Sequence, residues 1–143
     1  MMKKHSVFLL SLLAAVILGA CASAPPAPQS VAPEAASSGA LTRINVDQLA
    51  QMLADTKDFT LVNVHVPFEG DLPQTDLSIP FDQIDQHLAE LPGRDDKIVL
   101  YCRSGRMSDI AARRLVELGY TNVYDVTGGM VAWEAGGRSL VRP

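Results

Sequence analysis

The chain has 143 residues, which suits one ordinary domain with a tail and leaves too little for two domains. Hydrophobic residues make up 48% and charged residues 20%, so we expect a packed core and not disorder of the whole chain. The net charge is −4, from 12 Lys and Arg against 16 Asp and Glu. This acidic balance argues against a nucleic-acid binder.

The first twenty residues have the three parts of an export signal. Two lysines precede an almost unbroken apolar run over 7–18, and two small residues stand before Cys21. The tetrapeptide Leu-Gly-Ala-Cys that ends at Cys21 resembles the bacterial lipoprotein box, in which the chain is cut before the cysteine and the cysteine is acylated. The resemblance implies a signal peptide over 1–20 and lipidation of Cys21. An uncleaved anchor, or an ordinary signal peptide with an incidental cysteine, is the alternative.

The segment that follows has the composition of a tether. Residues 22–42 contain four of the nine prolines, a single charge and no apolar periodicity. We therefore expect a lipidated cysteine and flexible tether over 21–42, and a folded domain over 43–143. The expected location is the bacterial cell envelope, on the periplasmic or extracytoplasmic side. Ala22 does not match the aspartate that signals inner-membrane retention, which points to the outer membrane where the cell has one.

The folded part begins with a helix. Asn45 is followed three residues later by Gln48, which is a capping arrangement, and we expect a helix of about ten residues there. Apolar residues on one face predict a second helix over 81–91. A third helix is predicted over 108–118, where Gly119 ends it.

Three short, nearly continuous apolar runs suit strands that are covered on both faces of a parallel sheet. These runs occupy 59–64, 97–101 and 122–126. Strands that alternate with helices predict an α/β fold with an open, mainly parallel sheet flanked by helices. Ligands of such sheets bind beyond the carboxyl ends of the strands.

Cys102 stands where a predicted strand meets a predicted helix. It begins the sequence Cys-Arg-Ser-Gly-Arg-Met-Ser, whose last residue, Ser108, is the expected N-cap of the helix. Amides of a short glycine-containing loop and a helix N-terminus both favour anions, so we expect a cradle for an anionic sulfur or an oxyanion. The alternative role for Cys102 is that of a small buried hydrophobe.

Arginines gather after this cysteine in an otherwise acidic chain. Arg103 and Arg106 lie in the loop, and we expect at least one of them to help stabilise the sulfur anion. Arg113 and Arg114 lie a turn or more inside the predicted helix. For these two arginines we expect a solvated face rather than a ligand role.

At this point the chain resembles a known family. Residues 41–142 are similar to the single-domain form of the rhodanese (thiosulfate sulfurtransferase) family in the loop that starts at Cys102, in the helix after it and in segment 127–133 with its glycine pair and tryptophan. The resemblance implies a rhodanese-like fold in which Cys102 attacks the outer sulfur of a donor such as thiosulfate. The sulfur is then held as a persulfide and passed to cyanide or a thiol. No metal or other cofactor is implied.

The resemblance also implies roles for individual residues. Cys102 would be the nucleophile, and the amides after it would cradle the persulfide. The tryptophan of segment 127–133 is expected to pack rather than to contact substrate. The implied substrate-binding residues are Arg103, Ser104, Gly105, Arg106, Met107 and Ser108.

Two segments depart from the family pattern and concern the pocket wall. Asn63-Val64-His65 stands where many members have Asp-Val-Arg, and 69–77 replaces the usual Gly-His-Ile-Pro-Gly segment. His65 ends a predicted strand on the side of the site, which makes it a candidate pocket residue that donates a proton or binds substrate. A histidine that bonds the loop backbone is the alternative.

Other activities fit these residues less well. Phosphatases related in fold need an arginine six residues after the cysteine, where this chain has Ser108. A disulfide oxidoreductase usually has Cys-x-x-Cys, and position 105 is glycine. The main alternative is a module that carries persulfide from a protein donor, or only docks with one. We therefore expect a small anionic sulfur donor and a thiol or cyanide acceptor, with a protein donor or acceptor as the alternative.

Overall fold

The computed structural model describes residues 41–142, and the structural statements below concern that part of the chain. Five strands form one sheet in the order β1-β5-β4-β2-β3, and every neighbouring pair is parallel. The α/β class with an open parallel sheet is thereby confirmed. The strands are β1 (Leu41–Ile44), β2 (Thr60–Asn63), β3 (Leu77–Ser78), β4 (Ile98–Tyr101) and β5 (Val123–Val126).

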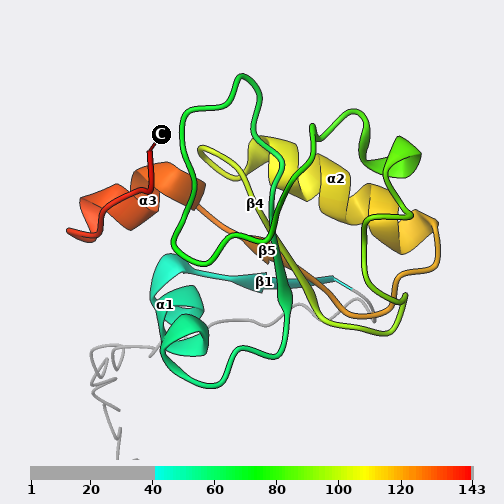
Figure 1. Cartoon of the computed structure of the whole chain (residues 1–143), viewed down its shortest axis with the longest axis horizontal. Helices are drawn as coiled ribbons and strands as arrows, with labels where there is room; N and C mark the ends of the chain where they lie inside the picture. The colour runs from blue at the N-terminus through cyan, green and yellow to red at the C-terminus, as the bar shows by residue number, and fades with distance from the viewer. Residues whose placement is uncertain (1–40, 143) are drawn as a thin grey trace, which may run out of the picture. The chain divides into compact units, whose positions relative to one another are not determined.

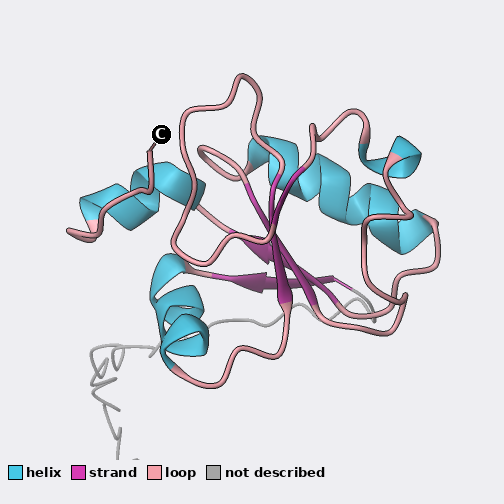
Figure 2. Cartoon of the chain, in the orientation of Figure 1, coloured by secondary structure: helices cyan, strands magenta, loops and turns pink. Residues whose placement is uncertain are grey.

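Three α-helices cover the two faces of this sheet. Figure 1 shows α1 and α3 on one side of the strands and α2 on the other. Figure 2 shows the same layers by secondary structure, with loops that join the ends of the strands to the helices. The helices are α1 (Val46–Ala54), α2 (Arg106–Glu117) and α3 (Gly129–Ala135), with one 3₁₀ turn, η1 (Ile84–Gln86).

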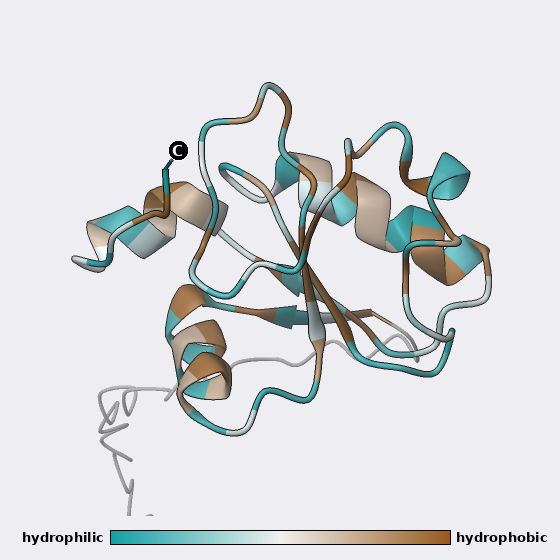
Figure 3. Ribbon diagram, in the orientation of Figure 1, coloured by the Kyte–Doolittle hydropathy of each residue, from teal (hydrophilic) through white to brown (hydrophobic). Residues whose placement is uncertain are grey.

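The central strand explains why the sheet needs both layers. All four residues of β4 are fully buried, because successive side chains point to opposite faces and each face is covered. Ile98 and Leu100 belong to the core under α2, whereas Val99 and Tyr101 belong to the core under α1 and α3. Figure 3 shows β4 mainly in brown, the colour of hydrophobic residues, whereas β1 and β5 also carry polar residues.

Helix α1 forms where the capping arrangement predicts it. The side-chain oxygen of Asn45 accepts hydrogen bonds from the amides of Asp47 and Gln48 at 3.0 and 2.9 Å. In return the Gln48 side chain accepts from the Asn45 amide at 2.8 Å. The reciprocal bonds satisfy amides that no helical carbonyl reaches, and so they define the first turn.

The predicted helix over 81–91 is wrong. Only the short turn η1 forms there, and successive amides bond to carbonyls three residues back, as Gln86 does to Gln83 at 2.9 Å. Ile84 and Leu91 are nevertheless buried in the core under α2. A chain of turns repeats every three residues and can bury the same apolar positions as an α-helix.

Two predicted boundaries also differ from the structure. Ser108 is not the N-cap of α2, because the helix begins at Arg106 after Gly105, which adopts a left-handed conformation with φ of 100°. The sheet begins at Leu41, two residues before the expected start of the folded domain at 43, because β1 pairs with β5. The predicted signal peptide and Cys21 lie outside the described residues. Within 41–142, no helix has the length and apolar character to cross a membrane.

Candidate active site

Cys102 directly follows the central strand β4, at its carboxyl end. Its Sγ atom accepts a hydrogen bond from the Gly105 amide at 3.1 Å. The Ser108 hydroxyl lies 3.6 Å from Sγ and 3.1 Å from the Gly105 carbonyl oxygen. Only 1% of the Cys102 surface is exposed, so the sulfur is buried and yet has polar partners. We call residues 102–105 the Cys102 loop.

The start of α3 supports the Cys102 loop through the backbone. The amide of Met130 donates to the Cys102 carbonyl at 3.0 Å, and the amide of Val131 donates to the Arg103 carbonyl at 2.9 Å. A Cβ atom on Gly129 would lie 2.1 Å from the Cys102 carbonyl oxygen, so only glycine permits this approach. The segment 127–133 thus borders the Cys102 loop, as the resemblance implied.

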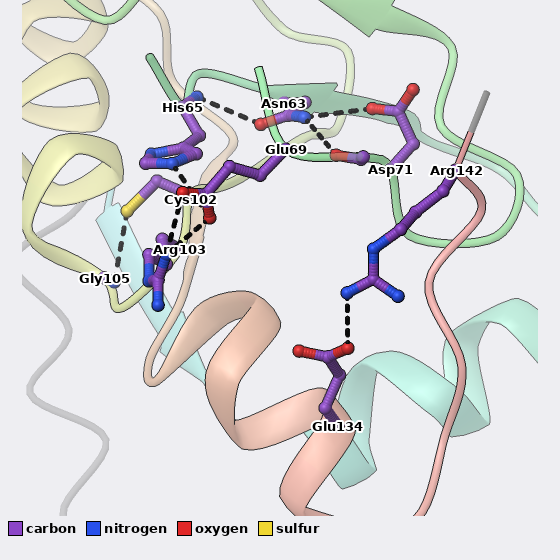
Figure 4. A network of polar contacts seen from close by, with 10 residues as sticks. Asn63, His65, Glu69, Asp71, Cys102, Arg103, Gly105, Glu134 and Arg142 are labelled. Atoms are coloured by element: carbon purple, nitrogen blue, oxygen red, sulfur yellow. Dashed lines mark hydrogen bonds and ion pairs between the residues drawn. The ribbon is translucent and has the colours of Figure 1, made fainter. Parts of the chain in front are cut away.

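A pocket of about 240 Å³ opens beside the sulfur. Four of the predicted substrate-binding residues line it, whereas Gly105 bonds the sulfur and Ser108 is fully buried behind it. Figure 4 shows Cys102 with Gly105 on one side and His65 on the other. The lining residues are His65, Cys102, Arg103, Ser104, Arg106 and Met107.

His65 enters this pocket from the loop after β2. Its side chain is 7% exposed, and neither ring nitrogen has a hydrogen-bond partner among the described residues. Its backbone amide, in contrast, donates to the Asn63 side chain at 3.0 Å. The alternative of a ring that bonds the loop backbone is therefore wrong. We call residues 64–76 the His65 loop.

An ion pair joins the two loops at the pocket. Arg103 Nη1 donates to both carboxylate oxygens of Glu69, at 2.8 and 2.6 Å (Figure 4). Glu69 Oε2 also lies 3.6 Å from His65 Nε2, which is too long for a hydrogen bond but close enough to attract the ring once it is protonated. Sequence reasoning noted Glu69 only as part of a departure from the family pattern, and its pairing with Arg103 was not predicted.

The remaining arginines differ in their partners. Within residues 41–142, no acidic side chain lies within ion-pair distance of Arg106, which lines the pocket. Arg113 pairs with Asp109 at 2.9 Å, and Arg114 pairs with Asp85 and Glu117 at 3.3 and 3.2 Å. Both Arg113 and Arg114 are exposed and lie outside the pocket lining, in agreement with the predicted solvated face.

Asn63 organises the His65 loop from the end of β2. This buried side chain donates to the Gly70 carbonyl at 3.0 Å and to Asp71 Oδ1 at 2.9 Å, and it accepts from the His65 amide. All three bonds hold loop backbone or a loop carboxylate (Figure 4). The departure from aspartate at position 63 therefore supplies a donor that a carboxylate lacks.

Tyr101 holds the same loop from below. Its hydroxyl accepts from the Leu72 amide at 3.0 Å and donates to Asp71 Oδ1 at 3.1 Å, while Thr75 Oγ1 lies 2.7 Å away. Burial raises the pKa of the Tyr101 hydroxyl far above its ordinary value. The group therefore stays protonated and keeps donating to Asp71.

Asp125 is a buried carboxylate of β5 on the α2 side of the site. Burial raises its pKa, and the Ser108 hydroxyl and the charge of Arg43 partly oppose that rise. Its Oδ1 atom has no hydrogen-bond partner among the described residues. Within 41–142, no three His, Cys, Asp or Glu side chains form a group that could hold a metal ion.

These features define a class of protein: a parallel α/β domain with one cysteine in a short loop at the carboxyl end of its central strand. The rhodanese-like domain family matches residues 45–136. The chain belongs to that family.

Similar proteins from other organisms agree with this assignment. A sulfurtransferase of Allochromatium vinosum is 37% identical over 106 residues, which cover 72% of this chain and 97% of that protein. A rhodanese-related protein of Thermoplasma volcanium has 29% identity and a TM-score of 0.59 over 69% of this chain and 96% of its own. An NAD-dependent persulfide reductase of A. fulgidus is 31% identical, with a TM-score of 0.52, over 63% of this chain and 15% of that one. Together they support sulfur transfer as the general activity.

Proposed function

We propose that the protein moves a sulfane sulfur atom from thiosulfate or a similar anionic donor to a thiophilic acceptor through a persulfide on Cys102. The observation that carries the proposal is the Cys102 sulfur, which meets the Gly105 amide at 3.1 Å and borders a pocket of about 240 Å³. An amide aimed at sulfur stabilises negative charge on it. A pocket of this size suits a small donor.

The chemistry requires two displacements at sulfur. The Cys102 thiolate attacks the outer sulfur of thiosulfate, a new S–S bond forms, and the S–S bond of the donor breaks so that sulfite leaves with the electron pair. The acceptor then attacks the outer sulfur of the persulfide, and Cys102 leaves as thiolate. Cyanide would become thiocyanate, and a thiolate would become a persulfide anion. Neither displacement changes the overall electron count, so no external oxidant is needed.

Mass spectrometry of the intact protein tests this proposal. Wild type incubated with thiosulfate should gain one sulfur atom, and cyanide should remove it. Cys102→Ser should gain none, because the serine hydroxyl is a far weaker nucleophile toward sulfur. Loading that occurs only from a protein persulfide donor would favour the carrier role, and the absence of an adduct from either donor would overturn both roles.

Arg106 supports an anionic donor, because it lines the pocket and no described acidic group neutralises it. Arg106→Gln should raise the thiosulfate concentration for half-maximal loading about fivefold, the scale of about 1 kcal/mol for one exposed charge. The difference should shrink at high salt. Arg113→Gln is the matched control, since that arginine is exposed, paired with Asp109 and outside the pocket lining.

We also propose that Cys21 is acylated and holds the domain at the bacterial cell envelope, on the periplasmic or extracytoplasmic side. The support is the sequence alone: an apolar run, two small residues and then cysteine. Cells grown with a radiolabelled fatty acid should label the wild type and Cys102→Ala but not Cys21→Ala. Equal labelling of all three would overturn the anchor.

A further inference from the structure

We infer that His65 accepts the proton of a thiol substrate, and that the physiological sulfur acceptor of this pocket is therefore a thiol. The inference rests on the proposed function, because it concerns the step in which the Cys102 persulfide is discharged. It assigns a role to a residue that stands where many family members have arginine. A neutral imidazole can take a proton near neutral pH, which a guanidinium cannot do.

The first observation is the state of the imidazole. His65 lines the same pocket as Cys102, its side chain is 7% exposed, and both ring nitrogens lack a hydrogen-bond partner among the described residues. A buried polar group without a partner is energetically unfavourable, because it has lost its hydrogen bonds to water. A molecule that enters the pocket can supply the missing partner beside the sulfur.

The second observation is the charge around the ring. Glu69 Oε2 lies 3.6 Å from His65 Nε2, so a carboxylate is in place to stabilise the imidazolium that proton transfer creates. Arg103, from the Cys102 loop, is engaged by both oxygens of the same carboxylate and does not repel the ring as a free cation would. Arg106, at the start of α2, is the remaining charged residue that lines the pocket.

These charges give the residues of the pocket different ligand preferences. Arg106 favours the anionic donor, because its cation has no described acidic partner. Around His65 the charges of Arg103 and Glu69 offset each other, so no free cation beside the ring holds an anion, and the ring suits a neutral ligand that gives up a proton. A thiol has that chemistry, since it must lose its proton before it can attack sulfur.

The step balances without another reactant. The neutral His65 ring takes the proton of the acceptor thiol, and the resulting thiolate attacks the outer sulfur of the Cys102 persulfide. A new S–S bond forms to the acceptor, the S–S bond to Cys102 breaks, and its electron pair remains on Cys102 as thiolate. The acceptor leaves as a persulfide anion, and the imidazolium later releases its proton to water.

The experiment compares two thiols of similar size and different acidity. Wild type, His65→Gln and His65→Asn are loaded with excess thiosulfate, desalted, and discharged with 2-mercaptoethanol or with the more acidic 2,2,2-trifluoroethanethiol. Loss of the sulfur adduct is followed by intact mass. His87→Gln is the matched control, because His87 pairs with Glu90 at 2.6 Å and lies outside the pocket lining.

Without the base, discharge by 2-mercaptoethanol should slow by about 100-fold, the lower end of the contribution of a general base. Discharge by the acidic thiol should slow much less, because a far larger fraction of that thiol than of 2-mercaptoethanol is already ionised at the same pH. Equal slowing for both thiols, or failure of both His65 variants to hold a persulfide that the wild type holds, would overturn the inference. Absence of the adduct on the wild type would overturn the proposed function instead.

Discussion

The two loops that form the pocket are fixed by different kinds of group. The Cys102 loop is short and is held by backbone: its carbonyls accept from the amides of Met130 and Val131, and its own Gly105 amide meets the sulfur. The His65 loop is longer and is held by side chains, chiefly those of Asn63 and Tyr101. Backbone donors are present whatever the sequence, whereas each side-chain donor depends on one residue type.

This difference in support determines which residues of the site can be substituted without changing its shape. A cradle built from amides survives most substitutions that keep the backbone path, so the sulfur environment depends mainly on glycines. The His65 loop carries the residues that face the substrate, and its shape depends on a few buried polar contacts. We expect the nucleophile's surroundings to be sensitive to backbone clearance and the pocket wall to be sensitive to lost hydrogen bonds.

The largest effect should come from Gly129→Ala, which breaks the support of the Cys102 loop. The new Cβ would lie 2.1 Å from the Cys102 carbonyl oxygen, at a φ of +51°. Overpacking together with the strained backbone should lower the free energy of unfolding by about 3 kcal/mol and abolish persulfide formation. Urea unfolding and intact mass would measure the two effects.

Gly137→Ala is the control for that variant. It has a comparable φ of +76°, but no atom lies within 4 Å of its Cβ position. It should therefore show only the left-handed backbone cost of about 1–2 kcal/mol and load sulfur normally. If both variants lost the same stability, the close approach of Gly129 would not be what holds the Cys102 loop.

The next largest effect should come from Tyr101→Phe, which breaks the support of the His65 loop. The buried Leu72 amide would lose its partner, and the unfolding free energy should fall by about 2 kcal/mol. Hydrogen exchange should quicken over 70–76 and not in the Cys102 loop. Tyr124→Phe is the control, since its hydroxyl has no hydrogen-bond partner among residues 41–142, and faster exchange in both loops would contradict their separate support.

Asp125→Asn should have a smaller effect, and it changes the charge on the α2 side of the Cys102 loop. Burial raises the pKa of Asp125 above its ordinary value of 3.8. Below pH 3.8 the carboxyl is neutral in both the folded and the unfolded chain and does not destabilise the fold. As the pH rises through the raised pKa, the folded chain must hold a buried charge, and the free energy of unfolding falls. Asparagine does not ionise, so the variant should be more stable than wild type at pH 7, by on the order of 1 kcal/mol.

This advantage should shrink as the pH falls toward the ordinary carboxyl value, where both side chains are neutral. Denaturant unfolding from pH 3.5 to pH 7 would follow it. A stability difference that stayed constant across this range would show that the carboxylate charge is not responsible.

The smallest effect should come from Glu69→Gln, which cuts the ion pair that joins the two loops. The pair is largely exposed, so the unfolding free energy should change by less than about 1 kcal/mol. Released Arg103 should speed loading by thiosulfate roughly threefold, while loss of the carboxylate beside His65 should slow discharge by 2-mercaptoethanol. Stopped-flow loading and mass-detected discharge would measure the two rates separately. If both rates changed in the same direction, the separate roles of Arg103 and Glu69 would be contradicted.

Local sequence predicted the elements whose bonds are local. The helix after Asn45 was predictable because both partners of its capping box lie within three residues. Strands β2, β4 and β5 were predictable because a fully covered parallel sheet requires continuous apolar runs, whereas β1 and β3 were not predicted. The position of Cys102 at the end of β4 follows from the same runs, so the proposed nucleophile was located without knowledge of its partners.

The segment 81–91 shows where periodicity is insufficient. Apolar spacing predicted the burial of Ile84 and Leu91 correctly, but turns and an α-helix can bury the same positions. Ser108 shows a related limit, since serine is a good N-cap and yet here it packs inward, behind the sulfur, within the first turn of α2. The start of that helix depends on the tight path of the Cys102 loop, which α3 enforces.

Neighbours along the chain were enough to predict the helix after Asn45, the strands β2, β4 and β5, and the place of Cys102 with the arginines that follow it. The pairing of Glu69 with Arg103 and the need for glycine at 129 became visible only in the folded domain. The same holds for the His65 ring, which faces the pocket without a hydrogen-bond partner among the described residues. These contacts join segments about 30 residues apart or more. Which distant groups meet depends on how the whole sheet and its two layers pack, and no local pattern records that.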